Sequence, residues 1–162
     1  MSNESKHDSA VKPIPLLMLT DIGRDIDDTL ALLALIGYHA SHRLKIVGII
    51  ATGGANLSRA CIVSGWLNRL TQAQESSGCG TSGLFSNIPV AVCGSSIGLE
   101  ECYSPPFTQT PEEAKLYHGS AVELILELCR SYPGLYLPLS LCLCLCLSHK
   151  YIYVHTYIHM AE

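Results

Sequence analysis

The chain has 162 residues, of which 48% are hydrophobic and 15% are charged, and its formal net charge is −4. This length fits one domain with a buried core and leaves little room for two. The negative charge argues against a nucleic-acid-binding protein, whose footprint is basic, so no nucleic-acid partner is expected.

Residues 1–12 are polar and mixed in charge, which predicts a disordered leader. They hold no apolar segment of the kind that a secretory signal requires. The eight cysteines form no C-x-x-C pair, so neither a zinc ribbon nor a thioredoxin-type motif is supported. Reduced thiols in a cytoplasmic protein are the expectation.

Strands and helices are predicted to alternate along the chain. Short apolar runs predict buried strands, and apolar residues at helical spacing predict the helices between them. In chain order, we predict a strand over 14–19, a helix over 28–38, a strand over 44–51, a helix over 57–70, a strand over 89–93 and a helix over 111–130.

Two of the helices carry start signals. Asp27 or Asp28 can cap the first, because a carboxylate accepts hydrogen bonds from free backbone N–H groups. Thr110 and Pro111, followed by two acidic residues, mark the start of the third.

This alternation predicts an α/β fold with an open, mostly parallel sheet flanked by helices. In such sheets ligands bind beyond the carboxyl ends of the strands. Asp21 and Thr52 follow the first and second predicted strands, so we expect their loops to open at the same edge.

The segment 135–162 differs in composition. Residues 135–147 have the sequence LYLPLSLCLCLCL and residues 151–160 the sequence YIYVHTYIHM, both close to two-letter repeats. We hypothesise that simple nucleotide repeats encode this tail and that the folded domain covers 13–134. A membrane span needs about 20 apolar residues. This run is shorter and contains Pro138, so no membrane partner is expected.

The chemistry-bearing segment is the loop after the first strand. Asp21, Asp25, Asp27 and Asp28 lie within eight positions, and Gly23 permits a tight turn among them. Their mutual repulsion is costly unless something neutralises it. A hard divalent cation with oxygen ligands is the natural solution, with Arg24 offsetting part of the charge.

This loop, Asp-Ile-Gly-Arg-Asp-Ile-Asp-Asp, resembles the opening motif of the inosine/uridine-preferring nucleoside hydrolases. The turn over 48–56 stands where that family has a Gly-Asn-like turn, and 121–134 is similar to the family helix before its third conserved strand. The resemblance covers about 14–134. It implies an incomplete Rossmann-like nucleoside hydrolase fold and an enzyme that uses Ca²⁺ to cleave ribonucleosides into ribose and free base.

The resemblance also implies residue roles. Asp21 would ligate calcium and act as general base on water, and Asp28 would be a second calcium ligand. Asp27 and Asn56 would bind the ribose, and Asp25 is a further candidate metal ligand. The chemistry suits these residue types, because a metal activates water, a carboxylate takes its proton, and anionic surroundings favour the cationic sugar.

Two departures from the family pattern predict weak or absent activity. Leu19 stands where the family has its first aspartate, and the family's second half has no counterpart after Gly134. Family members are commonly oligomers, so the resemblance also admits a homo-oligomer, although this sequence does not reveal the oligomeric state.

Two alternatives stay open at this point. The run from Asp25 to Leu30 matches the Asp-x-Asp-x-Thr-Leu signature of haloacid-dehalogenase-type phosphohydrolases, with Asp25 as nucleophile, Asp27 as acid/base and Thr52 as phosphate binder. That family requires a buried strand directly before the nucleophile, whereas Asp21–Arg24 intervenes here. The other alternative is a non-catalytic metal- or ribose-binding remnant.

Overall fold

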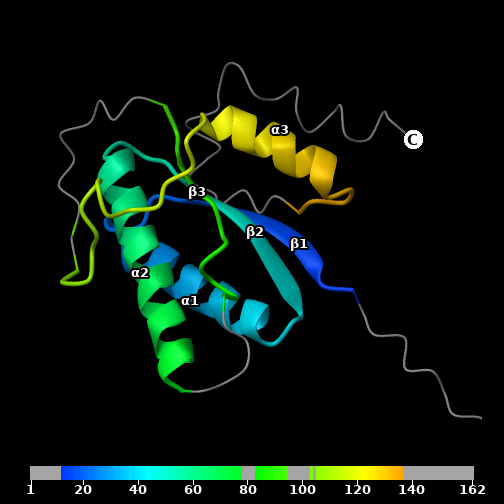
Figure 1. The fold of residues 1–162 in the computed structure, drawn as a ribbon. Coiled ribbons are helices and arrows are strands. Elements are labelled where there is room, and N and C mark those ends of the chain that lie inside the picture. The colour runs from blue at the N-terminus through cyan, green and yellow to red at the C-terminus, as the bar shows by residue number, and fades with distance from the viewer. Residues whose placement is uncertain (1–11, 78–82, 95–102, 104, 137–162) are drawn as a thin grey trace, which may run out of the picture.

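A computed structural model of the chain describes residues 12–77, 83–94, 103 and 105–136 (Figure 1). Nearly all of the predicted leader and of the predicted tail lies outside these residues. The elements in chain order are β1 (Ile14–Thr20), α1 (Ile26–Ala40), β2 (Leu44–Ala51), α2 (Asn56–Ser76), β3 (Val90–Val92) and α3 (Ala121–Ser131).

The three strands form one sheet in the order β1-β2-β3, and both neighbouring pairs are parallel. This confirms the predicted α/β class with an open parallel sheet. The register between β1 and β2 shifts once, between Leu16 and Leu17. From Ile46 to Ala51 every residue of β2 is buried, as expected for a strand covered on both faces.

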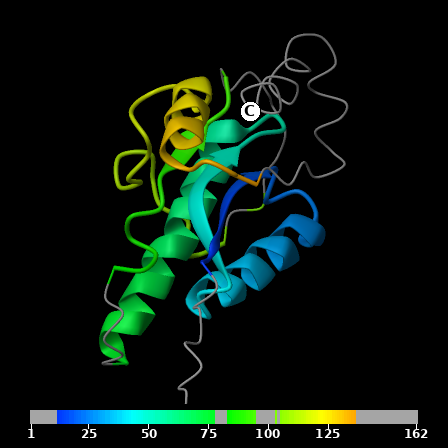
Figure 2. The same cartoon turned by 90° about the vertical axis from the view of Figure 1, so that its right-hand side faces the viewer.

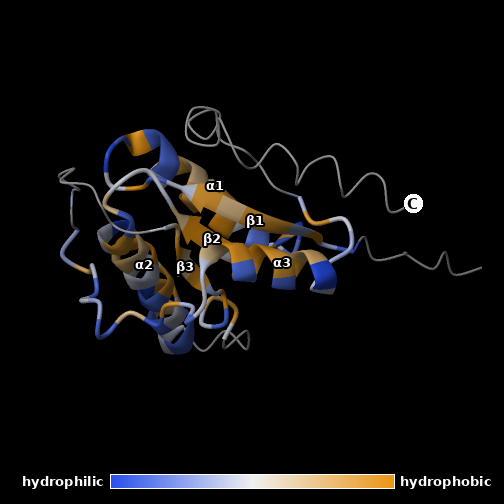
Figure 3. Ribbon diagram, turned by 90° about the horizontal axis from the view of Figure 1, so that it is seen from above, coloured by the Kyte–Doolittle hydropathy of each residue, from blue (hydrophilic) through white to orange (hydrophobic). Residues whose placement is uncertain are grey.

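Helices cover the two faces of the sheet unequally. Figures 1 and 2 show α1 and α2 on one face and α3 on the other. The first face packs through residues such as Met18, Leu32 and Val63, and the second through Leu17, Ile50 and Leu124. Figure 3 shows the consequence: hydrophobic strands in the middle and a hydrophilic outer side on α3.

Helix α1 begins differently from the prediction. Its N-cap is Asp25, whose side chain makes no capping hydrogen bond, and the helix starts at Ile26. The prediction that Asp27 or Asp28 caps it was therefore wrong. Asp28 is instead in the first turn, and its carboxylate accepts a hydrogen bond from the backbone N–H of Asp21.

Helix α3 is also shorter than predicted. Thr110 and Pro111 start only a turn, because Tyr117 N–H donates to the Val90 carbonyl and draws the chain alongside β3. The helix begins after Ser120, which forms a capping box with Glu123. Its 11 residues then run to Ser131.

After α3 the chain returns to the outer edge of β1. Tyr136 pairs in parallel with Leu16: its N–H donates to the Pro15 carbonyl at 2.9 Å, and its carbonyl accepts from Leu17 N–H at 3.1 Å. Leu135 packs against the core between α3 and the sheet. These two residues belong to the segment that the sequence assigned to the tail.

Candidate functional site

The loops after β1 and β2 open at the same edge of the sheet. Thr52 N–H donates to the Thr20 carbonyl at 2.8 Å, and the Thr52 hydroxyl donates to the same carbonyl at 3.3 Å. The Thr52 hydroxyl thus holds the two strand ends together. The acidic loop and the Gly53-Gly54 turn consequently face each other.

The strand order also reverses at β1, whose carboxyl end lies at this edge. From β1 the chain moves outward to β2 and β3 over one face, and after α3 it returns over the other face to lie beside β1. Open α/β sheets bind their ligands at such a reversal, beyond the carboxyl ends of the strands. Asp21 directly follows β1 at this point.

Asp21 and Asp28 come together across the loop. The Asp21 N–H donates to Asp28 Oδ2 at 2.7 Å, which fixes the Asp28 carboxyl beside the end of β1. Asp28 is 8% exposed. Burial, followed by the contact with the Asp21 carboxyl and its charge, raises the pKa of Asp28 from 3.8 to about 6. The pair is therefore poised to accept a positive charge.

Two glycines shape the space around Asp21. Gly23 and Gly53 both have positive φ angles, 97° and 79°, which side chains rarely adopt. A Cβ atom on Gly53 would lie 2.6 Å from the Asp21 Cβ. Close packing of the β2 turn against Asp21 thus depends on glycine at position 53.

The other two carboxylates of the loop do not join this pair. Asp25 and Asp27 are both exposed at the start of α1, and Arg24 is exposed as well. The acidic loop therefore brings together two of its four carboxylates.

Asn56 begins α2 at the same edge. Its side-chain amide donates to the Cys93 carbonyl, which ties it to the end of β3. Asn56 Oδ1 is buried and has no hydrogen-bond partner in the part of the chain that the structure describes. An unsatisfied buried acceptor calls for a donor, which a ligand hydroxyl can provide.

Arg59 is the site residue that the sequence did not indicate. This arginine of α2 is fully buried, and its Nη1 lies 3.9 Å from Asp21 Oδ2 and 3.3 Å from the Ile22 carbonyl. Arginine in a helix is ordinarily a surface residue, and only the tertiary fold places this one beneath the loop.

The described residues fit a divalent cation only as a partial ligand set. Among them, no three His, Cys, Asp or Glu side chains gather closely enough to form a metal site by themselves. Asp21 and Asp28 supply adjacent carboxylates, whereas calcium takes roughly six to eight oxygens. Water and substrate hydroxyls would have to complete such a shell.

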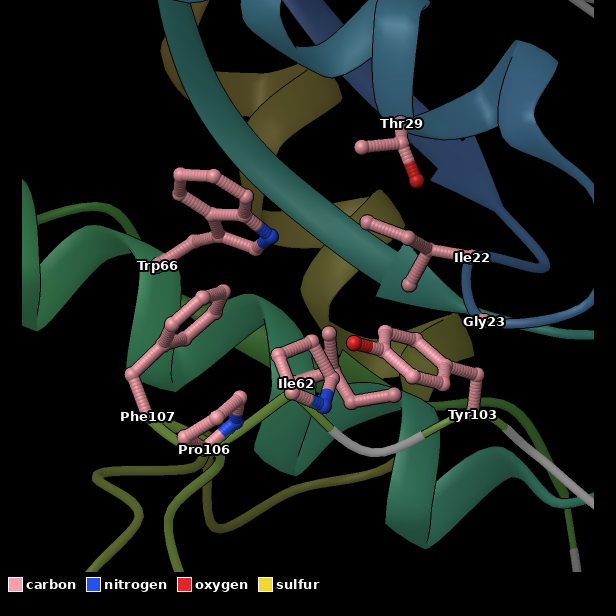
Figure 4. A pocket seen from close by; sticks show the side chains of 9 residues that line it. Ile22, Gly23, Thr29, Ile62, Trp66, Tyr103, Pro106 and Phe107 are labelled. Atoms are coloured by element: carbon pink, nitrogen blue, oxygen red, sulfur yellow. The ribbon is translucent and has the colours of Figure 1, made fainter.

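A cavity of about 240 Å³ adjoins the loop on the α1–α2 side (Figure 4). The backbone N–H of Tyr103 donates to the Gly23 carbonyl at 2.8 Å and closes one wall of it. The Trp66 and Phe107 rings meet edge-on in another wall, with their centroids 4.5 Å apart. No carboxylate is among the described residues that line the cavity, so these residues add no carboxylate ligand for a cation.

Comparisons of this chain with protein-family models, with curated proteins and with solved structures gave no match. Within the described ranges, none of the helices combines the length and the apolar composition that a transmembrane helix needs.

Proposed function

We propose that this chain is a nucleoside hydrolase-like protein whose site binds Ca²⁺ and the ribose of a ribonucleoside. Its turnover of the N-glycosidic bond is weak or absent. The observation that carries the proposal is the partly buried Asp21–Asp28 pair at the point where the strand order reverses. The motif resemblance of the loop supplies the substrate class.

In this proposal the chain's own residues divide the work. Asp21 and Asp28 hold the calcium, and Asp21 also accepts a proton from the attacking water. Asp27, exposed at the start of α1, and the unsatisfied Asn56 Oδ1 take hydrogen bonds from ribose hydroxyls. When bound, calcium would supply an acidified water and a centre for the ribose diol. Asp25 is not part of the pair, so its role as a ligand is the least supported.

Weak turnover follows from what the described residues provide. Two carboxylates make an incomplete calcium shell. The fixed Asp21–Asp28 contact still favours a cationic sugar electrostatically. We therefore expect ligand binding to survive better than catalysis.

The phosphohydrolase alternative is less well supported by the geometry. Its nucleophile would be Asp25, which is exposed at the N-cap of α1 and separated from the end of β1 by a turn. The Thr52 hydroxyl that would bind phosphate already donates to the Thr20 carbonyl.

The test is ribose release from inosine and uridine, measured with Ca²⁺ and with EDTA. We expect slow, calcium-dependent release that Asp21→Asn abolishes, while Asp25→Asn retains it. Calcium and ribose binding without release would support the non-catalytic alternative. Phosphate release from an aryl phosphate, abolished by Asp25→Asn, would overturn the proposal in favour of the phosphohydrolase.

A further inference from the structure

The largest fully buried side chain in the described part of the molecule is that of Arg59. It comes from the first turn of α2, which has no acidic residue of its own there. A cation near a helix N-terminus faces the positive end of the helix dipole, and its burial removes water as well. Arg59 therefore needs compensation from outside its helix.

That compensation comes from the acidic loop at two points. The Asp21 carboxylate lies 3.9 Å from Arg59 Nη1, and the same nitrogen donates to the Ile22 carbonyl at 3.3 Å. The guanidinium thus contacts both the side chain that starts the loop and the backbone that follows it. A planar, permanently charged group suits such a double contact.

The acidic loop in turn needs a positive charge beside its two adjacent carboxylates. Asp21 and Asp28 are in contact, and without a cation their repulsion opposes the folded loop. The loop's own cation, Arg24, is exposed, whereas Arg59 is fully buried and lies against Asp21.

We propose that Arg59 is a positioning residue and the built-in counter-ion of the acidic loop, which holds Asp21 beside Asp28 when no metal is bound. This inference rests on the proposed function only in its second part, that Arg59 and a divalent cation compensate the same charge. The loop is accordingly folded in the metal-free protein, and calcium adds to a site that already exists.

The first part is tested by a double-mutant comparison on the full chain in EDTA. Arg59→Met keeps much of the side-chain length and removes the charge, while Arg59→Lys keeps the charge. Because breaking a buried pair is strongly destabilising, we expect Arg59→Met to lower Tm by on the order of 10 °C, and Arg59→Lys by clearly less. In the Asp21→Asn background, the loss from Arg59→Met should fall by at least half.

Equal losses in the two backgrounds, or equal losses for Lys and Met, would show that Arg59 acts through packing and would overturn the inference. If Arg59→Met yields no folded protein, the same comparison is made with Arg59→Lys in the two backgrounds. There the Lys variant should lose less when Asp21 is replaced, and an unchanged loss would again contradict the inference.

The second part is tested by adding Ca²⁺ to the same proteins. Calcium should raise the Tm of Arg59→Met by more than it raises the Tm of the wild type, because the variant lacks its internal counter-ion. An equal or smaller rise in the variant would contradict the shared compensation. If calcium shifts no protein at all, the metal part of the proposed function fails, whereas the double-mutant result in EDTA still decides the role of Arg59.

Discussion

Asp28 shows how one residue links the fold to the site. Its pKa is raised from 3.8 to about 6, first by burial and then by Asp21. Between about pH 4 and pH 6 the folded chain therefore holds a proton that the unfolded chain has lost. The stability linked to this proton is complete below the window and is lost as the pH rises through it.

We predict that Asp28→Asn stabilises the metal-free protein at pH 7.5. The shift corresponds to at most about 3 kcal/mol, at about 1.4 kcal/mol per pH unit, and solvent screening reduces it. The gap between variant and wild type should close at pH 4. Urea unfolding in EDTA at the two pH values measures it, with Asp27→Asn as the exposed control that should show no gap.

Gly53 is the second residue on which the geometry of the site depends. Gly53→Ala places a Cβ 2.6 Å from the Asp21 Cβ, in addition to the strain of a φ angle of 79°. Gly94→Ala is a matched control, because Gly94 also has a positive φ and no atom of the described residues lies within 4 Å of the added Cβ. We expect Gly53→Ala to be less stable than Gly94→Ala by about 1–3 kcal/mol in urea unfolding. Equal stabilities would show that Asp21 moves aside freely.

Sequence reasoning found part of this site. The pairing of Asp21 and Asp28 follows from their positions around a glycine at a strand end. The sequence did not predict that Asp25 and Asp27 would lie apart from this pair, because their positions depend on where α1 begins. Arg59 carries no local signal, since its partner lies in another element and is reached only through the packing of α2 against the loop.

At the scale of elements, local patterns predicted the strands better than the helix ends. The bounds of β2 were predicted to the residue, since the run from Leu44 to Ala51 is mostly apolar and rich in Ile and Val. The start of α3 was missed because the signal at Thr110 is genuine but local. The hydrogen bond from the Tyr117 N–H to the Val90 carbonyl draws the chain alongside β3, so no helix continues beyond the first turn.

His39 joins α1 to β2 and to the turn before β3, and its replacement tests that junction. Its ring is buried, Nδ1 accepts from the Ile46 N–H at 3.1 Å, and Nε2 lies 3.1 Å from the Leu84 carbonyl, to which it donates. His39→Ala leaves both backbone groups without this partner, so we expect a loss of roughly 2–4 kcal/mol.

Chemical unfolding measures this loss. The matched control is His42→Asn, an exposed position with a φ angle of 56° that asparagine tolerates. A loss below about 1 kcal/mol for His39→Ala would mean that water replaces both contacts.

At the scale of the whole molecule, the chain returns after α3 to the outer side of β1. This return makes β1 the point where the strand order reverses, and the site lies at the carboxyl end of β1. This return rests on Leu135 and Tyr136, which the sequence placed in the tail because their composition matches the repeat that follows. Composition cannot reveal a backbone pairing with a strand 120 residues earlier in the chain (Tyr136 with Leu16).

We predict that a chain ending at Tyr136 is more stable than a chain ending at Gly134. The longer chain keeps two backbone hydrogen bonds to β1 and the packing of Leu135. A difference in Tm of several degrees is expected, because each such contact contributes about 1 kcal/mol. Indistinguishable melting curves would show that the return to β1 adds no stability.

The central claim is that Asp21 and Asp28 form a cation site at the edge where the sheet reverses. Calorimetric titration of the full chain with Ca²⁺ at pH 7.5 tests it most directly. We expect saturable binding of about one calcium ion per chain, weakened at least tenfold by Asp28→Asn and little changed by Asp25→Asn. Absence of binding at millimolar calcium, or equal binding by the wild type and Asp28→Asn, would contradict the claim.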